Sequence, residues 1–132
     1  MTVKLTAGMA LYHGTDAEFD EECESLLGPA WLSSSRSVAE SFAKRSGGWG
    51  GEKRIIEYRL TSDVDLHDIH TSLEMQEFAE RHGINLDGVE EMRESVEMAG
   101  IAGWVIPHNY PDGDDILIVD TDILEFVSSH PL

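Results

Sequence analysis

Apolar and polar residues alternate most clearly in the stretch "KRIIEYRLTSDVDL", where Ile56, Tyr58 and Leu60 fall on one face of a predicted strand. Shorter apolar segments, "MALYH" and "AWLSS" in the first third of the chain and "GWVI", "DILIV" and "DILEFV" near its end, predict further strands. Strands are therefore expected at both ends of the sequence and in its middle.

Three other segments have helical spacing. "RSVAESFAKR" follows Ser35, a suitable N-cap, and its apolar face includes Phe42. "TSLEMQEFAERHG" ends on Gly83, and "NLDGVEEMRESVEMAG" carries an apolar stripe and ends on Gly100, so both glycines are expected just beyond a helix. Strands and helices are mixed without a repeated strand–helix–strand period. The order predicts one compact α+β domain over residues 1–132.

The net charge of the chain limits the kinds of molecule that it is expected to bind. The 132 residues include 9 Lys and Arg against 26 Asp and Glu, a formal net charge of -17. A field of this sign opposes binding to nucleic acid and to anionic membranes and favours basic partners, although solubility alone can also explain it. The single cysteine, Cys23, excludes an internal disulfide and fits a reducing compartment. No leader peptide or membrane-spanning run is visible, which predicts a soluble, cytoplasmic protein.

Three stretches carry candidate chemistry, and they lie far apart in the sequence. In "LYHGT", His13 ends a predicted strand and Gly14 allows a ligand to approach the backbone. In "AWLSSSRSVAESFA", Trp31 offers a flat face beside hydroxyls, which suits a planar ring such as nicotinamide or a base. In "GDDILIVD", Asp115 begins a predicted strand, where a carboxylate can bind a sugar or stabilise positive charge. Each stretch also has a structural interpretation as a strand end, a core aromatic with capping serines, or a turn.

Taken in order, these stretches resemble the ADP-ribosyltransferase family, in the branch that uses a His, an aromatic residue and an acid. "LYHGT" resembles the first motif of small phage or bacterial enzymes and of the poly(ADP-ribose) polymerase catalytic core. "GPAWLSSSRSVAESFA" resembles the second, with Trp31 in place of the stacking tyrosine and Phe42 at a second aromatic position. "AGIAGWVIPHNYPDGDDILIVDTDILEFV" is similar to the C-terminal strand pair, with Asp115 where the family usually has the catalytic Glu. The resemblance extends from Leu11 to Val127.

The resemblance implies a compact α+β fold with a split mixed or antiparallel sheet and flanking helices. It implies NAD as a substrate and a protein acceptor that receives a single ADP-ribose unit, in the manner of a phage or mobile-element effector that inactivates a host protein. Because this chain is acidic, the acceptor is expected to have a basic surface. The implied catalytic residues are Asp115 and His13, and the implied NAD-binding residues are His13, Gly14, Thr15, Trp31, Ser33, Ser34 and Phe42.

In the implied mechanism, the Asp115 carboxylate stabilises the oxocarbenium character that develops when the N-glycosidic bond of NAD breaks. His13 holds the adenosine-side ribose, and the backbone of Gly14 binds the nicotinamide amide. Trp31 stacks on the ring, while the region of Ser33 and Ser34 lines the pocket.

Other functions remain open from the sequence. The chain could be an acidic, non-enzymatic inhibitor that mimics nucleic acid on a basic partner, or an NAD glycohydrolase that uses water as the acceptor. His67 and His70 in "HDIH" have a spacing that metal sites use, but no further ligands accompany them, so we expect no metal site. "DGDD" lacks the length and the terminal Glu of a calcium loop.

Overall fold

The computed structural model describes residues 2–15, 29–45, 52–110 and 113–132. Cys23 and most of the glycine-rich stretch "SGGWGGE" lie outside these ranges. The chain is an α+β protein, as predicted. In chain order its elements are β1 Thr2–Leu5, β2 Ala10–Thr15, β3 Ala30–Leu32, α1 Arg36–Arg45, β4 Arg54–Leu60, β5 Val64–Asp68, α2 Ser72–His82, α3 Val89–Ala99, β6 Gly103–Tyr110, β7 Gly113–Ile118, the 3₁₀ turn η1 Thr121–Ile123 and β8 Leu124–Pro131.

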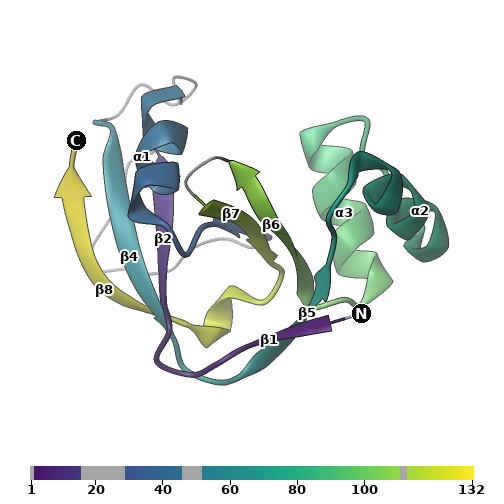
Figure 1. Cartoon of the computed structure of the whole chain (residues 1–132), viewed down its shortest axis with the longest axis horizontal. Helices are drawn as coiled ribbons and strands as arrows, with labels where there is room; N and C mark the ends of the chain where they lie inside the picture. The colour runs from purple at the N-terminus through teal and green to yellow at the C-terminus, as the bar shows by residue number, and fades with distance from the viewer. Residues whose placement is uncertain (1, 16–28, 46–51, 111–112) are drawn as a thin grey trace.

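The strands form two sheets, a five-stranded one in the order β1-β5-β6-β7-β3 and a three-stranded one in the order β2-β4-β8 (Figure 1). Neighbouring strands are antiparallel except β5 and β6, which are parallel because α2 and α3 form the crossover between them. An isolated bridge joins the sheets, in which Tyr12 and Ser33 exchange backbone hydrogen bonds of 2.8 and 2.9 Å. The result is the split, mixed sheet that was predicted, and we call the junction of β2 and β3 the seam.

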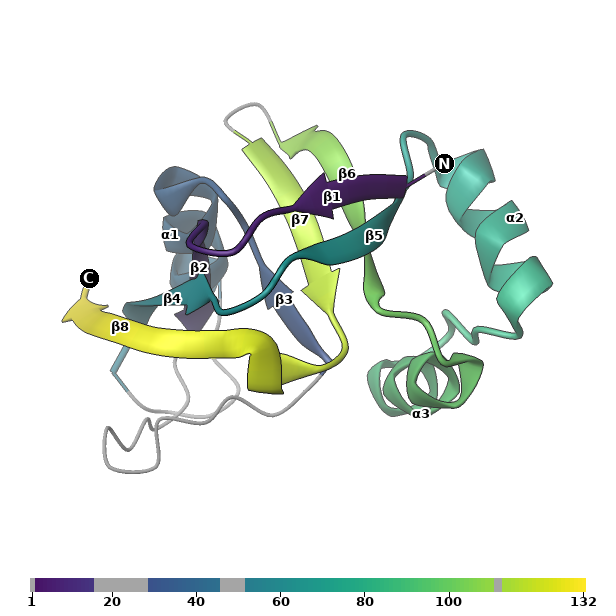
Figure 2. The ribbon, with the colours of Figure 1, turned by 90° about the horizontal axis from the view of Figure 1, so that it is seen from below.

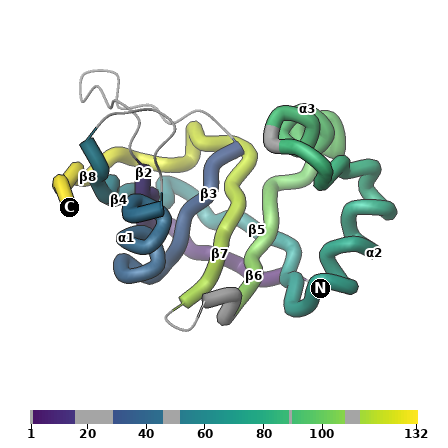
Figure 3. Tube along the Cα trace, turned by 90° about the horizontal axis from the view of Figure 1, so that it is seen from above, coloured from purple at the N-terminus to yellow at the C-terminus, as the bar shows by residue number. Residues whose placement is uncertain are grey.

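The helices lie at opposite ends of the molecule. α1 packs against β2 and β4, whereas α2 and α3 lie next to β5 and β6, on the side away from α1 (Figures 2 and 3). Gly83 ends α2 and Gly100 ends α3, as predicted, with φ of 69° and 70°. This left-handed conformation strains a residue with a Cβ, so glycine is favoured at both positions. The helix ends are thus set by local sequence.

Two clusters of buried side chains form the core. One lies between the two sheets and includes Tyr58, whose predicted strand face is buried. The other lies between the five-stranded sheet and the helix pair, where Phe78 of α2 and Val96 of α3 pack near Trp104 of β6. Side chains of the first cluster pack between the two sheets at the seam, and those of the second hold β6 against the helix pair.

Two strands differ from expectation. β1 pairs with β5 along its whole length, from Thr2 opposite His67 to Leu5 opposite Val64, although its four residues are too few for a clear pattern. β7 begins at Gly113, so Asp115 is its third residue rather than its first. Asp115 is therefore a strand residue paired with Ile106 of β6, not a residue of the preceding turn.

Two negative findings apply to the described part of the chain. No helix there is long and apolar enough to cross a membrane. Within the same ranges, no three His, Cys, Asp or Glu side chains are grouped closely enough to hold a metal ion.

Candidate functional site

A pocket of about 350 Å³ opens beside the seam. Among the described residues, those that line it come from four elements of the fold. Two are the seam strands β2 and β3, and the others are α1, which contributes Phe42, and β7, which contributes Asp115. The structure thus brings five of the predicted site residues into one cavity. They are His13, Gly14, Trp31, Phe42 and Asp115.

His13 is held by the strand across the seam. Its Nδ1 lies 2.7 Å from the backbone carbonyl oxygen of Trp31, and because a carbonyl can only accept, Nδ1 must carry the proton. The other ring nitrogen, Nε2, is then a hydrogen-bond acceptor in the neutral ring. Burial lowers the pKa of His13 below its usual 6.5, and the Trp31 carbonyl only partly offsets this effect. At neutral pH the site therefore contains a neutral, oriented imidazole.

Two aromatic side chains provide the pocket with flat apolar surface. Trp31 is half-buried and packs edge-on against Trp104 of β6, with ring centroids 5.7 Å apart and an interplanar angle of 64°. This contact fixes the indole, because such edge-to-face packing has a preferred geometry. Phe42 of α1 is also half-buried, and the guanidinium carbon of Arg45 lies 5.5 Å from its ring centroid. Trp31 therefore contacts the core and lines the pocket at once.

Gly14 has no side chain, and this allows α1 to pack closely against β2. A Cβ at this position would lie 1.9 Å from the carbonyl oxygen of Ala39 and 2.8 Å from the backbone nitrogen of Ala43, both in α1. Those distances are shorter than any real contact, so a side chain here would displace the helix. The sequence indicated that Gly14 admits a ligand to the backbone. The structure shows that it also admits α1, and with it Phe42, to the side of β2.

Asp115 contributes the carboxylate of the pocket. The residue is only 9% exposed, whereas the other acids that the structure describes are partly or fully exposed. Removing a carboxylate from water is costly unless its surroundings stabilise the charge. No lysine or arginine lies among the described residues that line the pocket. A cationic group bound in the pocket would lie near the Asp115 carboxyl group.

Ser33 and Ser34 are placed differently from the prediction. Their hydroxyls do not lie among the described residues of the pocket lining but bind Asp114, the neighbour of Asp115. The Ser33 hydroxyl is 2.8 Å from both the carbonyl oxygen and Oδ1 of Asp114, and the Ser34 hydroxyl is 2.6 Å from Oδ2. The Ser34 amide also donates to Oδ1 at 2.8 Å.

These contacts give Asp114 a structural role at the start of the strand. Its carboxylate connects the start of β7 to the junction between β3 and α1, and we call this set of hydrogen bonds the Asp114 clamp. Ser33 is fully buried, so its hydroxyl depends on these partners. The signal in the sequence was a serine run at a strand-to-helix junction, but nothing in the sequence identified the carboxylate that binds it.

The remaining candidates lie elsewhere. Thr15, the last residue of β2, pairs with Arg54 of β4 and is not among the described lining residues. His70 lies at the far end of the molecule, where its Nε2 is 2.9 Å from Oδ2 of Asp68. A second cavity, of about 190 Å³, adjoins that pair and is lined by residues of β5 and α2, among them His67 and Glu77.

No protein-family model matches the chain, and no curated protein matches it either. Its fold resembles that of a chain in the crystal structure of the M. tuberculosis MbcT–MbcA toxin–antitoxin complex. The two share 14% sequence identity with a TM-score of 0.53, over 98% of this chain and 86% of the other. At this level of identity the likeness shows a common fold.

Proposed function

We propose that this protein is an NAD-dependent mono-ADP-ribosyltransferase that transfers ADP-ribose from NAD to a side chain of a protein acceptor. The observation that carries the proposal is the convergence of His13, Trp31 and Asp115 on one pocket. These residues lie on three strands and are separated by up to about a hundred positions in the sequence.

The contents of the pocket suit the nicotinamide end of oxidised NAD. Its pyridinium ring is flat and positively charged, and aromatic faces attract such a cation. Trp31 and Phe42 supply those faces, and the buried carboxylate of Asp115 supplies a compensating charge. Reduced NAD, whose nicotinamide ring is neutral, would lose both attractions. The arrangement therefore favours the form of the ligand that has a good leaving group.

In the proposed reaction the bond between the ribose C1′ and the nicotinamide nitrogen breaks. Its electron pair goes to the ring, and nicotinamide leaves as a neutral molecule. The Asp115 carboxylate stabilises the positive charge that develops at C1′, and a nucleophilic atom of the acceptor then bonds to C1′ and gives up its proton to water. Neutral His13 accepts a hydrogen bond from a ribose hydroxyl through Nε2, while its Nδ1 stays on the Trp31 carbonyl. His13 thus orients the sugar rather than transferring a proton.

The partners of the protein follow from the same proposal. The chain that shares its fold comes from a toxin–antitoxin complex. We extend that setting to this protein, as an effector that modifies a protein target and is held in check by a protein partner. The net charge of -17 favours a basic target surface.

Isotope-labelled NAD incubated with the protein and a lysate tests the proposal, with mass spectrometry of the products. The expected result is a labelled protein, together with release of nicotinamide. Asp115→Asn preserves the size of the side chain and removes its charge, so the transfer rate is expected to fall by about 10²- to 10³-fold. Asp120→Asn, at an exposed acid outside the pocket, is the matched control and should leave the rate unchanged.

The same experiment separates the two rival functions. Free ADP-ribose without a labelled protein would identify an NAD glycohydrolase with water as the acceptor. Failure of the wild-type protein to bind or consume NAD, together with stoichiometric inhibition of a basic partner, would identify an acidic inhibitor. The strongly negative charge is the observation that favours this last alternative.

A further inference from the structure

The cations of this acidic chain are unevenly distributed. Four of its 9 Lys and Arg residues fall between positions 44 and 54, and the residues from 46 to 51 that separate them carry no charge. We call Lys44, Arg45, Lys53 and Arg54 the basic cluster. The other cations are dispersed along the chain. They are Lys4, Arg36, Arg59, Arg81 and Arg93.

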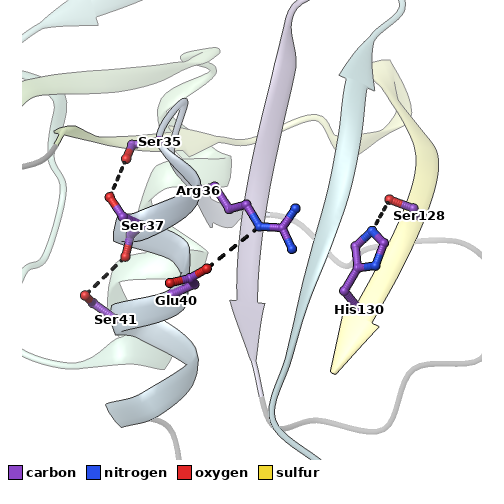
Figure 4. Close-up of polar contacts among 7 residues, drawn as sticks. All are labelled: Ser35, Arg36, Ser37, Glu40, Ser41, Ser128 and His130. Carbon is purple, nitrogen blue, oxygen red and sulfur yellow. Dashed lines mark hydrogen bonds and ion pairs between the residues drawn. The ribbon is translucent and has the colours of Figure 1, made fainter. Parts of the chain in front are cut away.

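The two halves of the basic cluster lie side by side. The ammonium Nζ of Lys53, just before β4, donates a hydrogen bond of 2.7 Å to the carbonyl oxygen of Lys44 in the last turn of α1. Arg54 also forms an ion pair with the exposed Glu52, at 3.5 Å. At the other end of α1, Arg36 in the first turn is 3.8 Å from the carboxylate of Glu40 (Figure 4).

The basic cluster borders the pocket at two points. The guanidinium of Arg45 lies over Phe42, whose ring lines the pocket, with 5.5 Å between the guanidinium carbon and the ring centroid. On the other side, Arg54 pairs with Thr15, the residue directly after the pocket residue Gly14. A group that extends from the pocket past Phe42 and the end of β2 would therefore reach the cluster.

The dipole of α1 explains part of this arrangement. Cations in the last turn of a helix interact favourably with its C-terminal carbonyls, and Lys44 and Arg45 lie in that turn. Lys53 also satisfies one of those carbonyls. A hydrogen bond of 3.2 Å from Arg45 Nε to the carbonyl oxygen of Ser41 also holds the Arg45 side chain along α1. Neither the dipole nor this bond explains why Arg54 joins the cluster from β4. The convergence of cations from α1 and β4 beside the pocket indicates a site for an anion there.

The size of the pocket also supports an anion site next to it. Its volume of about 350 Å³ is close to the lower end of the roughly 300–1,000 Å³ range of small-molecule sites. This space suits a planar ring with its sugar, and the described lining offers no cation for a phosphate. We infer that the basic cluster binds the diphosphate group of a dinucleotide whose planar ring occupies the pocket. For NAD as that dinucleotide, the inference rests on the proposed function.

Calorimetric titration with three probes tests this inference. NAD carries the diphosphate, nicotinamide riboside carries the same cationic ring and sugar without it, and inorganic pyrophosphate carries the anion alone. In Arg45→Gln, the affinity for NAD should fall by about tenfold or more, because a charge-assisted contact is lost. The affinity for nicotinamide riboside should stay the same or rise slightly, because this ligand is itself a cation. Arg45→Lys, which keeps the charge, should recover most of the NAD affinity.

Arg93→Gln, on α3 at the far end of the molecule, is the matched control and should leave all three affinities unchanged. A second variant, Arg54→Gln, guards against a folding defect in the first, and urea unfolding of each variant checks its stability. Equal losses for NAD and nicotinamide riboside, or no loss for either, would overturn the inference.

The outcome for wild-type protein separates this inference from the proposed function. If wild-type protein does not bind NAD, the proposed function fails, and the pyrophosphate titration then decides the inference. Pyrophosphate binding that weakens with salt and is lost in Arg45→Gln supports an anion site. Absence of pyrophosphate binding in that case overturns it.

Discussion

The hydroxyl of Ser33 and the carboxylate of Asp114 lie 2.8 Å apart, although 81 positions separate them in the sequence. This hydrogen bond belongs to the Asp114 clamp and joins the end of β3 to the start of β7. Trp31 lies two residues before Ser33, and Asp115 directly follows Asp114. The clamp therefore fixes the relative positions of the stacking aromatic residue and the buried carboxylate.

Loss of the clamp should destabilise the protein. In Asp114→Ala, the Ser33 and Ser34 hydroxyls and one backbone amide lose a charged acceptor, so the free energy of unfolding is expected to fall by about 1–3 kcal/mol. Asp114→Asn keeps one carbonyl oxygen and can donate to Ser34, so its loss should be smaller. Urea unfolding of the two variants measures the difference. Equal stability of Asp114→Ala and wild type would show that the clamp contributes nothing.

Gly14→Ala should disturb both the stability and the pocket. The added Cβ would meet the α1 backbone at 1.9 Å, and the helix can move away only by displacing Phe42. Overpacking of this kind costs about 1–3 kcal/mol, and we expect NAD binding to be lost as well. Gly88→Ala is a suitable control, since the Cβ there would meet the mobile end of the Glu91 side chain instead of backbone. A Gly14→Ala protein with wild-type affinity would contradict the tight packing of α1 on β2.

Protonation of His13 should weaken ligand binding in mild acid. Because burial lowers its pKa below 6.5, the neutral ring predominates from pH 8 to 6.5, and NAD affinity should change little over that range. Below pH 6.5 protonation removes the Nε2 acceptor, and the affinity should decline. His13→Ala should bind weakly at every pH, whereas His130→Ala, at an exposed ring that bonds to Ser128 (Figure 4), should retain the wild-type profile.

The same lowered pKa also affects stability. As the pH falls below 6.5, the unfolded chain takes up the proton before the folded chain does, so the free energy of unfolding decreases. His67, whose pKa is lowered by burial and by the nearby His82, contributes in the same direction. Acid stability measured on wild-type protein therefore reports both residues, and the comparison of His13→Ala with His67→Ala separates them.

Tyr58→Phe should preserve or raise stability. No hydrogen-bond partner for the Tyr58 hydroxyl lies among the residues that the structure describes, and the side chain is fully buried. Removing an unsatisfied buried hydroxyl should stabilise the protein by about 1 kcal/mol, measured by urea unfolding at pH 7. Tyr12→Phe, at a half-buried tyrosine, provides the comparison. A clear loss of stability in Tyr58→Phe would show that the hydroxyl has a partner after all.

Burial also raises the pKa of Tyr58 to about 12 from its usual 10.0. Between these values the unfolded chain ionises and the folded chain does not, so wild-type stability should decline as the pH rises above 10. Tyr58→Phe should lose this contribution, which a pH series of unfolding measurements can detect.

The local pattern of the sequence was sufficient for most of the elements. Gly83 and Gly100 end helices because glycine tolerates a left-handed backbone, and the alternation around Tyr58 marks a strand because its period is two. Such signals operate within a few residues. β1 carries a weaker signal, since four residues show little alternation and its identity as a strand depends on pairing with β5.

The site was predictable only where a residue's own chemistry indicated its role. A histidine, a tryptophan and an acid stand out as candidates, but the contacts that place them are between distant segments. Gly14 illustrates this limit, because only the packing of Ala39 and Ala43 shows what its missing side chain allows. Asp114 and Asp115 are adjacent and chemically identical, and only the three-dimensional structure distinguishes the one that holds the serines from the one that lines the pocket.

The pocket lies where the bridge between Tyr12 and Ser33 joins the two sheets. His13 and Gly14 belong to one sheet, whereas Trp31 and Asp115 belong to the other, so any ligand in the pocket contacts both sheets. Such a ligand acts as a non-covalent crosslink across a junction where the two Tyr12–Ser33 backbone hydrogen bonds and the bond from His13 to the Trp31 carbonyl also join the sheets. The amide protons of Tyr12 and Ser33 will therefore exchange with solvent more slowly when the pocket is filled, and these two protons report occupancy without any label on the ligand.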